Sequence, residues 1–175
     1  MMKQFFHLDR RGMLAEGQTL NLKPIEITTD YHDIKEHAHI LFPEGVSMHG
    51  DFYLNKVIPQ DSHSEWFYEY VRRAGFNQRP SRFQSVFAFE TLEDLEKFKI
   101  EREIEESIPV FLVECDKFFR ADMNLISYNP SPLSMSCLAY NYWSGETNED
   151  INKRFGIEPL WENLLVGPVH VLARI

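Results

Sequence analysis

Three histidines lie close together in the N-terminal third of the chain. His32, His37 and His39 fall within eight residues, and imidazole is a common ligand of zinc. On a helix the two-residue step from His37 to His39 points the side chains apart, whereas on a strand both would share one face. The spacing is not the H-E-x-x-H pattern of metal-dependent hydrolases. We therefore expect no metal site here, and a metal-dependent hydrolase using this cluster is the weakest of the functional hypotheses.

Four arginines in an eleven-residue segment could steer a small anion. Arg72, Arg73, Arg79 and Arg82 form the densest basic segment that we find in the chain. Guanidinium groups bind phosphate through paired hydrogen bonds, so a dinucleotide pyrophosphate is a candidate ligand. Solvated charges at a helix end and in a loop explain the same pattern equally well.

Glu162 stands at the start of an apolar segment, residues 161–166, that is predicted to form a strand. A polar group buried there without a partner would cost about 2–7 kcal/mol. If Glu162 is buried, a hydrogen-bonded or functional role is therefore favoured. If it is exposed, it is a carboxylate that begins a strand.

Several sequence patterns for ligand binding and catalysis are absent. The chain has no G-x-G-x-x-G segment, no Walker A segment and no G-x-S-x-G nucleophile elbow. The two cysteines, Cys115 and Cys137, imply neither a disulfide framework nor a structural zinc site. Classical dinucleotide folds, P-loop enzymes and serine hydrolases of the elbow type are therefore not expected.

Composition predicts one globular domain over residues 1–175. Hydrophobic residues make up 43% of the chain and the net charge is −9. The apolar segments are far shorter than the roughly 20 residues of a membrane helix, and no secretory leader is recognisable. We expect a cytoplasmic protein that makes no membrane contact. The acidic balance favours a protein over a nucleic acid as macromolecular partner.

Strands and helices are predicted to follow one another irregularly along the chain. Strands are expected at residues 4–8, 19–22, 82–89, 109–114, 161–166 and 169–175, and residues 50–59 are expected to be a loop or an irregular strand. Helices are expected at residues 30–41, 62–74, from Thr91 onward and at 133–143, with Ser62 and Thr91 as N-caps and Pro132 in the first turn. This order indicates an α+β fold with a mixed sheet and helices between the strands.

Three segments together resemble the signature of the ADP-ribosyltransferase superfamily. They are Phe6-His-Leu on the first strand, residues 79–90 in the centre, and residues 161–171 at the end. The resemblance spans the chain, and residues 162–169 are its most specific part. It implies the split mixed sheet of that superfamily, NAD as substrate, and transfer of ADP-ribose to a macromolecular acceptor.

The resemblance also implies roles for individual residues. His7 would hold a ribose of NAD, Ser81 or Ser85 would be the central polar residue, with Ser81 preferred, and Glu162 would be catalytic. Its carboxylate would bond the ribose 2′-hydroxyl and stabilise the oxocarbenium-like centre that forms when nicotinamide leaves.

The remaining expected NAD contacts are aromatic and basic. Phe83 or Tyr140 would stack on nicotinamide, and Arg82 or Arg79 would meet the pyrophosphate. Leu160 replaces the acidic or Gln residue found two positions before the catalytic Glu in arginine-modifying members, which argues against arginine as acceptor. The alternative is a non-catalytic protein-binding or inhibitor protein on the same fold, because fold membership does not establish activity.

Overall fold

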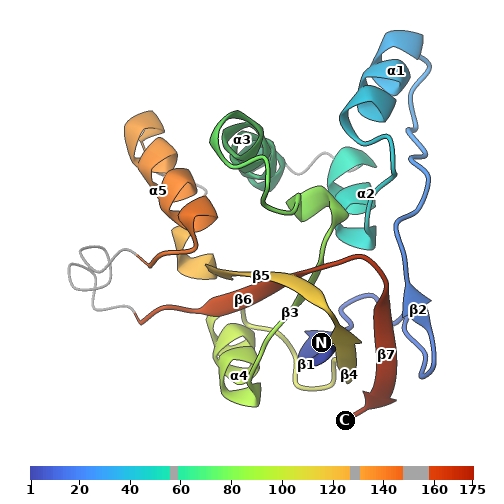
Figure 1. Ribbon diagram of the computed structural model, residues 1–175, viewed down its shortest axis with the longest axis vertical. Coiled ribbons are helices and arrows are strands. Elements are labelled where there is room, and N and C mark those ends of the chain that lie inside the picture. The colour runs from blue at the N-terminus through green and yellow to red at the C-terminus, as the bar shows by residue number, and fades with distance from the viewer. Residues whose placement is uncertain (56–58, 127–130, 148–157) are drawn as a thin grey trace.

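The computed structural model describes residues 1–55, 59–126, 131–147 and 158–175. Within these residues the fold is α+β, as expected, with five α-helices and two β-sheets (Figure 1). No helix of the described residues is long and apolar enough to span a membrane.

Both sheets are antiparallel. The larger sheet has the order β1-β4-β7-β2, formed by Lys3–Leu8, Val110–Cys115, Val169–Arg174 and Thr19–Leu20. The smaller has the order β3-β6-β5, formed by Val86–Ala88, Trp161–Val166 and Lys117–Asp122. The prediction of a mixed sheet is wrong for these strands, since every pair is antiparallel. A helix between two strands suggests a parallel crossover, but here the chain re-enters each sheet in the opposite direction.

Two pairs of consecutive strands run through both sheets. β4 leads into β5 across the single residue Asp116, and β6 leads into β7 across Gly167 and Pro168. Gly167 has φ +85°, a backbone conformation that favours glycine. Because β4 pairs with β7 and β5 pairs with β6, the two sheets are the halves of one bent antiparallel pair. On the other side, backbone hydrogen bonds of 2.8 Å join Phe6 of β1 to Phe89 after β3.

The helices cover the sheets unequally. Figure 1 shows α1, α2, α3 and α5 above the smaller sheet and α4 below it. Their bounds are His32–Leu41 for α1, Met48–Asn55 for α2, Pro59–Gly75 for α3, Leu92–Glu101 for α4 and Pro132–Ser144 for α5. Two short 3-10 helices, η1 (Arg82–Gln84) and η2 (Met123–Leu125), complete the fold.

Two helix starts confirm the sequence predictions. Thr91 caps α4 through its hydroxyl, which accepts from the Asp94 amide at 3.0 Å. Pro132 occupies the first turn of α5. The capping role of Ser62 is wrong, because α3 begins at Pro59 and Ser62 lies inside it.

Two other segments differ from the predictions. Residues 50–59 were expected to be a loop or an irregular strand, but residues 48–55 form α2 and α3 begins at Pro59, while residues 56–58 lie outside the described residues. Residues 82–89, expected to be one strand, contain η1 followed by the short β3.

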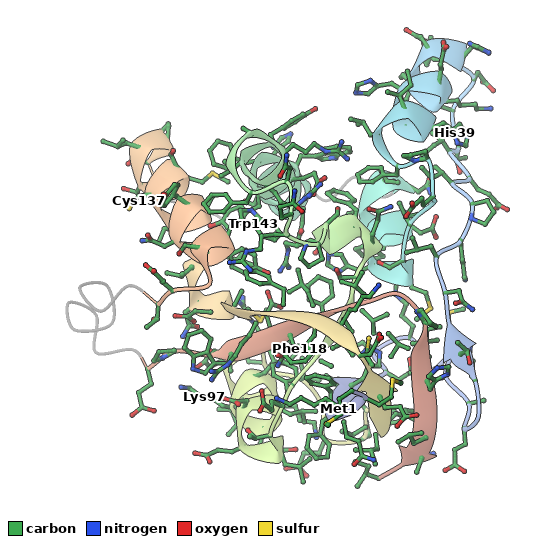
Figure 2. All side chains as sticks on the ribbon, in the orientation of Figure 1. Met1, His39, Lys97, Phe118, Cys137 and Trp143 are labelled. Carbon is green, nitrogen blue, oxygen red and sulfur yellow. The ribbon has the colours of Figure 1, made fainter. Side chains whose placement is uncertain are left out.

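The two faces of β6 pack against two different clusters of buried residues. Leu164 packs with aromatic residues of α3 and α5, whereas Leu165 packs with apolar residues of the larger sheet. Trp143 is fully buried, and its indole N–H donates to the Tyr68 carbonyl at 2.8 Å. Figure 2 shows Trp143 between α5 and α3 and Cys137 farther along α5. The helical layer is thus tied to β6, the strand that carries Glu162.

Candidate functional site

A cavity of about 640 Å³ opens between the two sheets and α2. This central cavity collects side chains from β1, α2, α3, the Ser81–Ser85 segment, β3 and β6. The buried and half-buried polar residues that line it include His7, His49, Glu65, Arg82, Ser85 and Glu162, together with Asp9 and Ser47. Its volume lies within the range, roughly 300–1,000 Å³, of pockets that bind small molecules and cofactors.

His7 lies on β1 with its ring fixed by the neighbouring strand. Nδ1 is 2.6 Å from the Phe87 carbonyl oxygen. A carbonyl only accepts, so Nδ1 carries the proton and Nε2 is left as an acceptor. Burial lowers the pKa of His7, although the Phe87 carbonyl and Asp9 act in the opposite direction. His7 is therefore held as a neutral imidazole at the cavity wall.

Glu162 is the second residue of β6 and is only 2% exposed. Its Oε1 accepts from Arg82 Nη1 at 2.5 Å and from the Tyr142 hydroxyl at 2.7 Å. No hydrogen bond to its Oε2 is found among the described residues. Because Glu162 lines the cavity, the unbonded oxygen is the one available to a ligand.

Arg82 joins two buried carboxylates. Its Nε and Nη2 donate to both oxygens of Glu65, at 2.8 and 2.9 Å, while Nη1 contacts Glu162. Burial disfavours the charge of Arg82, but Glu162 and Glu65 outweigh it and raise the pKa of the guanidinium well above its usual value. Burial likewise opposes ionisation of Glu65, yet Arg82 and His49 hold the pKa of this carboxyl well below its usual range.

Tyr142 is the fourth member of this buried group. Its hydroxyl accepts from Arg82 at 2.6 Å and donates to Glu162. Burial and Glu162 raise the pKa of Tyr142 well above its usual value, against the effect of Arg82. The phenol therefore stays protonated. Two carboxylates and one guanidinium leave an excess negative charge at the inner end of the cavity, which favours a ligand that carries or develops positive charge.

Local hydrogen bonds hold the segment that carries Arg82. The Ser81 hydroxyl caps η1 by accepting from the Phe83 amide at 3.2 Å, and it donates to Glu69 at 2.8 Å. The Ser85 hydroxyl donates to the Ser81 carbonyl at 2.7 Å. Both serines are buried, but only Ser85 lines the central cavity. Of the two serines, only Ser85 could be reached by a ligand in this cavity.

The structure brings four of the predicted site residues together and leaves four elsewhere. His7, Arg82, Ser85 and Glu162 line the cavity. Ser81 does not, and Phe83 and Tyr140, expected to stack on a ligand ring, also lie outside it.

Phe83 is 1% exposed and packs against Phe42 and Trp66 in a separate core cluster. Tyr140 is 60% exposed on the outer side of α5, beside Phe76. Arg82 reaches the cavity, but its three nitrogens are engaged by Glu65, Glu162 and Tyr142 rather than free for a phosphate.

The cavity also contains residues that the sequence analysis missed. Aromatic side chains form one wall: Phe52 and Tyr53 of α2, and Phe87 of β3. They were missed because residues 50–59 were not expected to be helical, and because Phe87 was counted as an ordinary strand residue. Glu65 was interpreted only as the partner of Ser62 in a capping box, and His49 carried no motif. Their place at the cavity depends on α2 and α3 packing beside η1.

The outer part of the cavity is basic. Four cationic side chains line it there, namely Arg10, Arg11, Lys23 and Arg102. Arg11 donates to the Met48 carbonyl at 2.7 Å and lies over the Phe52 ring. The cavity therefore combines a negatively charged inner end with a positively charged mouth.

Arg79, the other predicted phosphate contact, lies outside the cavity and instead donates to the carbonyl of Trp143.

The N-terminal histidines do not form a ligand set in this structure. His32, His37 and His39 lie on α1, and all three are exposed. Across the described ranges, no group of three or more His, Cys, Asp or Glu side chains is arranged to hold a metal ion.

Comparison with known families assigns the chain to one of them. Residues 5–175 match the family described as "Protein of unknown function (DUF2441)", so the chain belongs to that family. No curated protein matches the chain.

Proposed function

We propose that this protein is an NAD-dependent ADP-ribosyltransferase that uses the central cavity as its active site. The observation that carries the proposal is the convergence of His7, Ser85 and Glu162, three residues far apart in sequence, on one cavity. On this proposal the two sheets correspond to the split sheet of that superfamily.

Glu162 is the proposed catalytic residue. Departure of nicotinamide leaves an oxocarbenium-like centre on the ribose, which a nearby carboxylate stabilises. The Oε1 of Glu162 is held by Arg82 and Tyr142. On this proposal its Oε2 accepts from the ribose 2′-hydroxyl. The excess negative charge shared with Glu65 adds to this stabilisation.

His7 and Ser85 are the proposed ribose contacts. The neutral His7 ring has Nε2 available to accept from a sugar hydroxyl. The Ser85 hydroxyl donates its proton to the Ser81 carbonyl, so its oxygen can only accept a hydrogen bond from the ligand. Two acceptors suit a polyhydroxylated ligand.

The other parts of NAD find complementary surroundings. A flat, cationic nicotinamide ring suits the wall of Tyr53 and Phe87 near the negatively charged inner end. The pyrophosphate suits the basic mouth, where Arg11 and Arg102, rather than the expected Arg82 and Arg79, are the proposed contacts. A macromolecular acceptor, a protein rather than a nucleic acid in view of the net charge of −9, completes the proposed reaction in the cytoplasm.

One observation favours a second candidate, a binding or inhibitor protein without catalysis. Arg82 lies 2.5 Å from Glu162 and offsets its negative charge. A carboxylate neutralised in this way stabilises a developing cation less than a free one does. On this alternative the cavity binds its ligand without breaking a bond.

The test uses NAD labelled in the adenylate part. Nicotinamide release and transfer of label into a cell extract are measured for the wild type, Glu162→Gln and the matched surface variant Glu101→Gln. Glu101 is exposed at the end of α4. Loss of one stabilising group predicts a rate about 10²–10³ lower for Glu162→Gln alone.

Binding measurements separate the two candidates. Calorimetric binding of NAD without nicotinamide release would support the binding protein. Absence of both binding and release in wild-type protein would overturn the NAD proposal. Circular dichroism of each variant checks that the fold is retained.

A further inference from the structure

His49 presents a buried nitrogen to the carboxylate of Glu65. Its Nε2 makes no hydrogen bond within the described residues, and it lies 3.5 Å from Glu65 Oε1, an ion-pair distance. The side chain of His49 is 24% exposed, and it lines the central cavity. The ring therefore has one buried edge and one edge open to a ligand.

Packing holds the His49 ring in one orientation. The ring centroid is 4.4 Å from that of Phe87 and 4.7 Å from that of Tyr53. The next residue, Gly50, allows α2 to approach η1 closely, since an added Cβ would lie 2.1 Å from the Phe83 carbonyl oxygen. A ring held between two aromatic neighbours and a closely packed helix is preorganised for proton transfer.

Glu65 supplies the charge that an imidazolium would need. Its Oε1 lies 3.5 Å from His49 Nε2. A carboxylate at this distance favours the tautomer with the proton on Nε2, which leaves Nδ1 as the basic nitrogen. Among the residues that the structure describes, Nδ1 makes no hydrogen bond. A carboxylate that orients an imidazole and stabilises its protonated form is a recurring arrangement in enzymes that use a histidine base.

We propose that His49 is the general base that activates the acceptor, with Glu65 as its orienting carboxylate. This inference rests on the proposed transferase activity. Arg82 bonds both Glu65 and Glu162, so one guanidinium links the proton-accepting pair to the carboxylate that faces the ribose.

The reaction balances with NAD and the acceptor alone. The bond between ribose C1′ and the nicotinamide nitrogen breaks, and its electron pair leaves with neutral nicotinamide. The acceptor oxygen or nitrogen forms a new bond to C1′, and its proton passes to His49 Nδ1. The proton then returns to solvent, since His49 is partly exposed.

Azide distinguishes proton removal from other roles of His49. This anion attacks C1′ without losing a proton, so it needs no base. We expect His49→Gln to slow hydrolysis and transfer by about 10²–10⁴, the usual contribution of a general base. The same variant should react with azide at the wild-type rate. Glu162→Gln should be slow with both nucleophiles, and the exposed His39→Gln should match the wild type.

Each outcome has one meaning. Normal hydrolysis and transfer by His49→Gln would show that no base is needed there. Slow reaction with azide as well would place His49 in binding or bond cleavage, and it would overturn the assignment. If wild-type protein consumes no NAD with any nucleophile, the transferase proposal fails and this inference fails with it. Slow hydrolysis with normal azide reaction supports both.

Discussion

The buried group around Arg82 makes stability depend on pH through Glu65. The folded-state pKa of Glu65 lies well below its value of 4.5 in an unfolded chain. Its contribution to stability is therefore fully present above pH 4.5 and is lost as the pH falls below it. The loss amounts to about 1.4 kcal/mol for each pH unit between the unfolded and folded pKa values.

Glu65→Gln tests this linkage. At pH 7 the variant should be less stable than the wild type by about 3 kcal/mol, because a buried ion pair loses one partner. The difference should shrink below pH 4.5, since the variant has no Glu65 carboxylate to protonate. Urea denaturation at a series of pH values measures both proteins. A difference that stays constant down to pH 3 would contradict the prediction, and the exposed Glu101→Gln should stay close to the wild type throughout.

At the scale of residues, the sequence predicted which segments carry the site better than it predicted the contacts. Glu162 and His7 were selected from the family resemblance, and each stands on a strand whose apolar pattern is readable. Tyr142 and Glu65 could not, because they reach Glu162 and Arg82 across 20 and 17 residues of chain. Such contacts depend on how helices pack on a sheet, and no local pattern records that.

At the scale of elements, the least predictable segment is α2. Residues 48–55 mix aromatic, polar and glycine residues, and glycine is a poor helix former. Tertiary contact explains the glycine, because η1 lies so close that no Cβ fits at position 50. In contrast, the Thr91 cap and the proline in the first turn of α5 are local signals, and those two helices were predicted correctly. The strands at residues 161–166 and 169–175 were also predicted from a local signal, the apolar pattern of their own residues.

Gly50→Ala should displace α2. The new Cβ would lie 2.1 Å from a backbone oxygen, so the helix must move as a whole. Overpacking of this kind typically costs about 1–3 kcal/mol. Thermal denaturation should show the loss, and ligand binding should weaken because α2 carries His49, Phe52 and Tyr53. Gly75→Ala is the matched control, since nothing lies within 4 Å of a Cβ there. Equal stability of the two variants would contradict the close packing of α2 on η1.

At the scale of the whole molecule, the bent strand pair predicts cooperative unfolding. β4 and β5 are separated only by Asp116, and β6 and β7 only by Gly167 and Pro168, so each sheet shares backbone with the other. A sheet that opened alone would break the register of the other at these bends. The two sheets should therefore behave as one folding unit, as small single domains usually do.

Hydrogen exchange of the strand amides measures this coupling. Paired amides of β4 in the larger sheet and of β5 in the smaller sheet should give the same free energy of opening, equal to that of global unfolding. The two-residue strand β2 should open at lower free energy, because among the described strands it lies at the sheet edge and pairs with β7 alone. Addition of a cavity ligand should raise the value for both sheets equally, because the cavity is lined from both. A rise confined to one sheet would mean that the sheets unfold separately, and it would place the ligand-binding residues within a single subdomain.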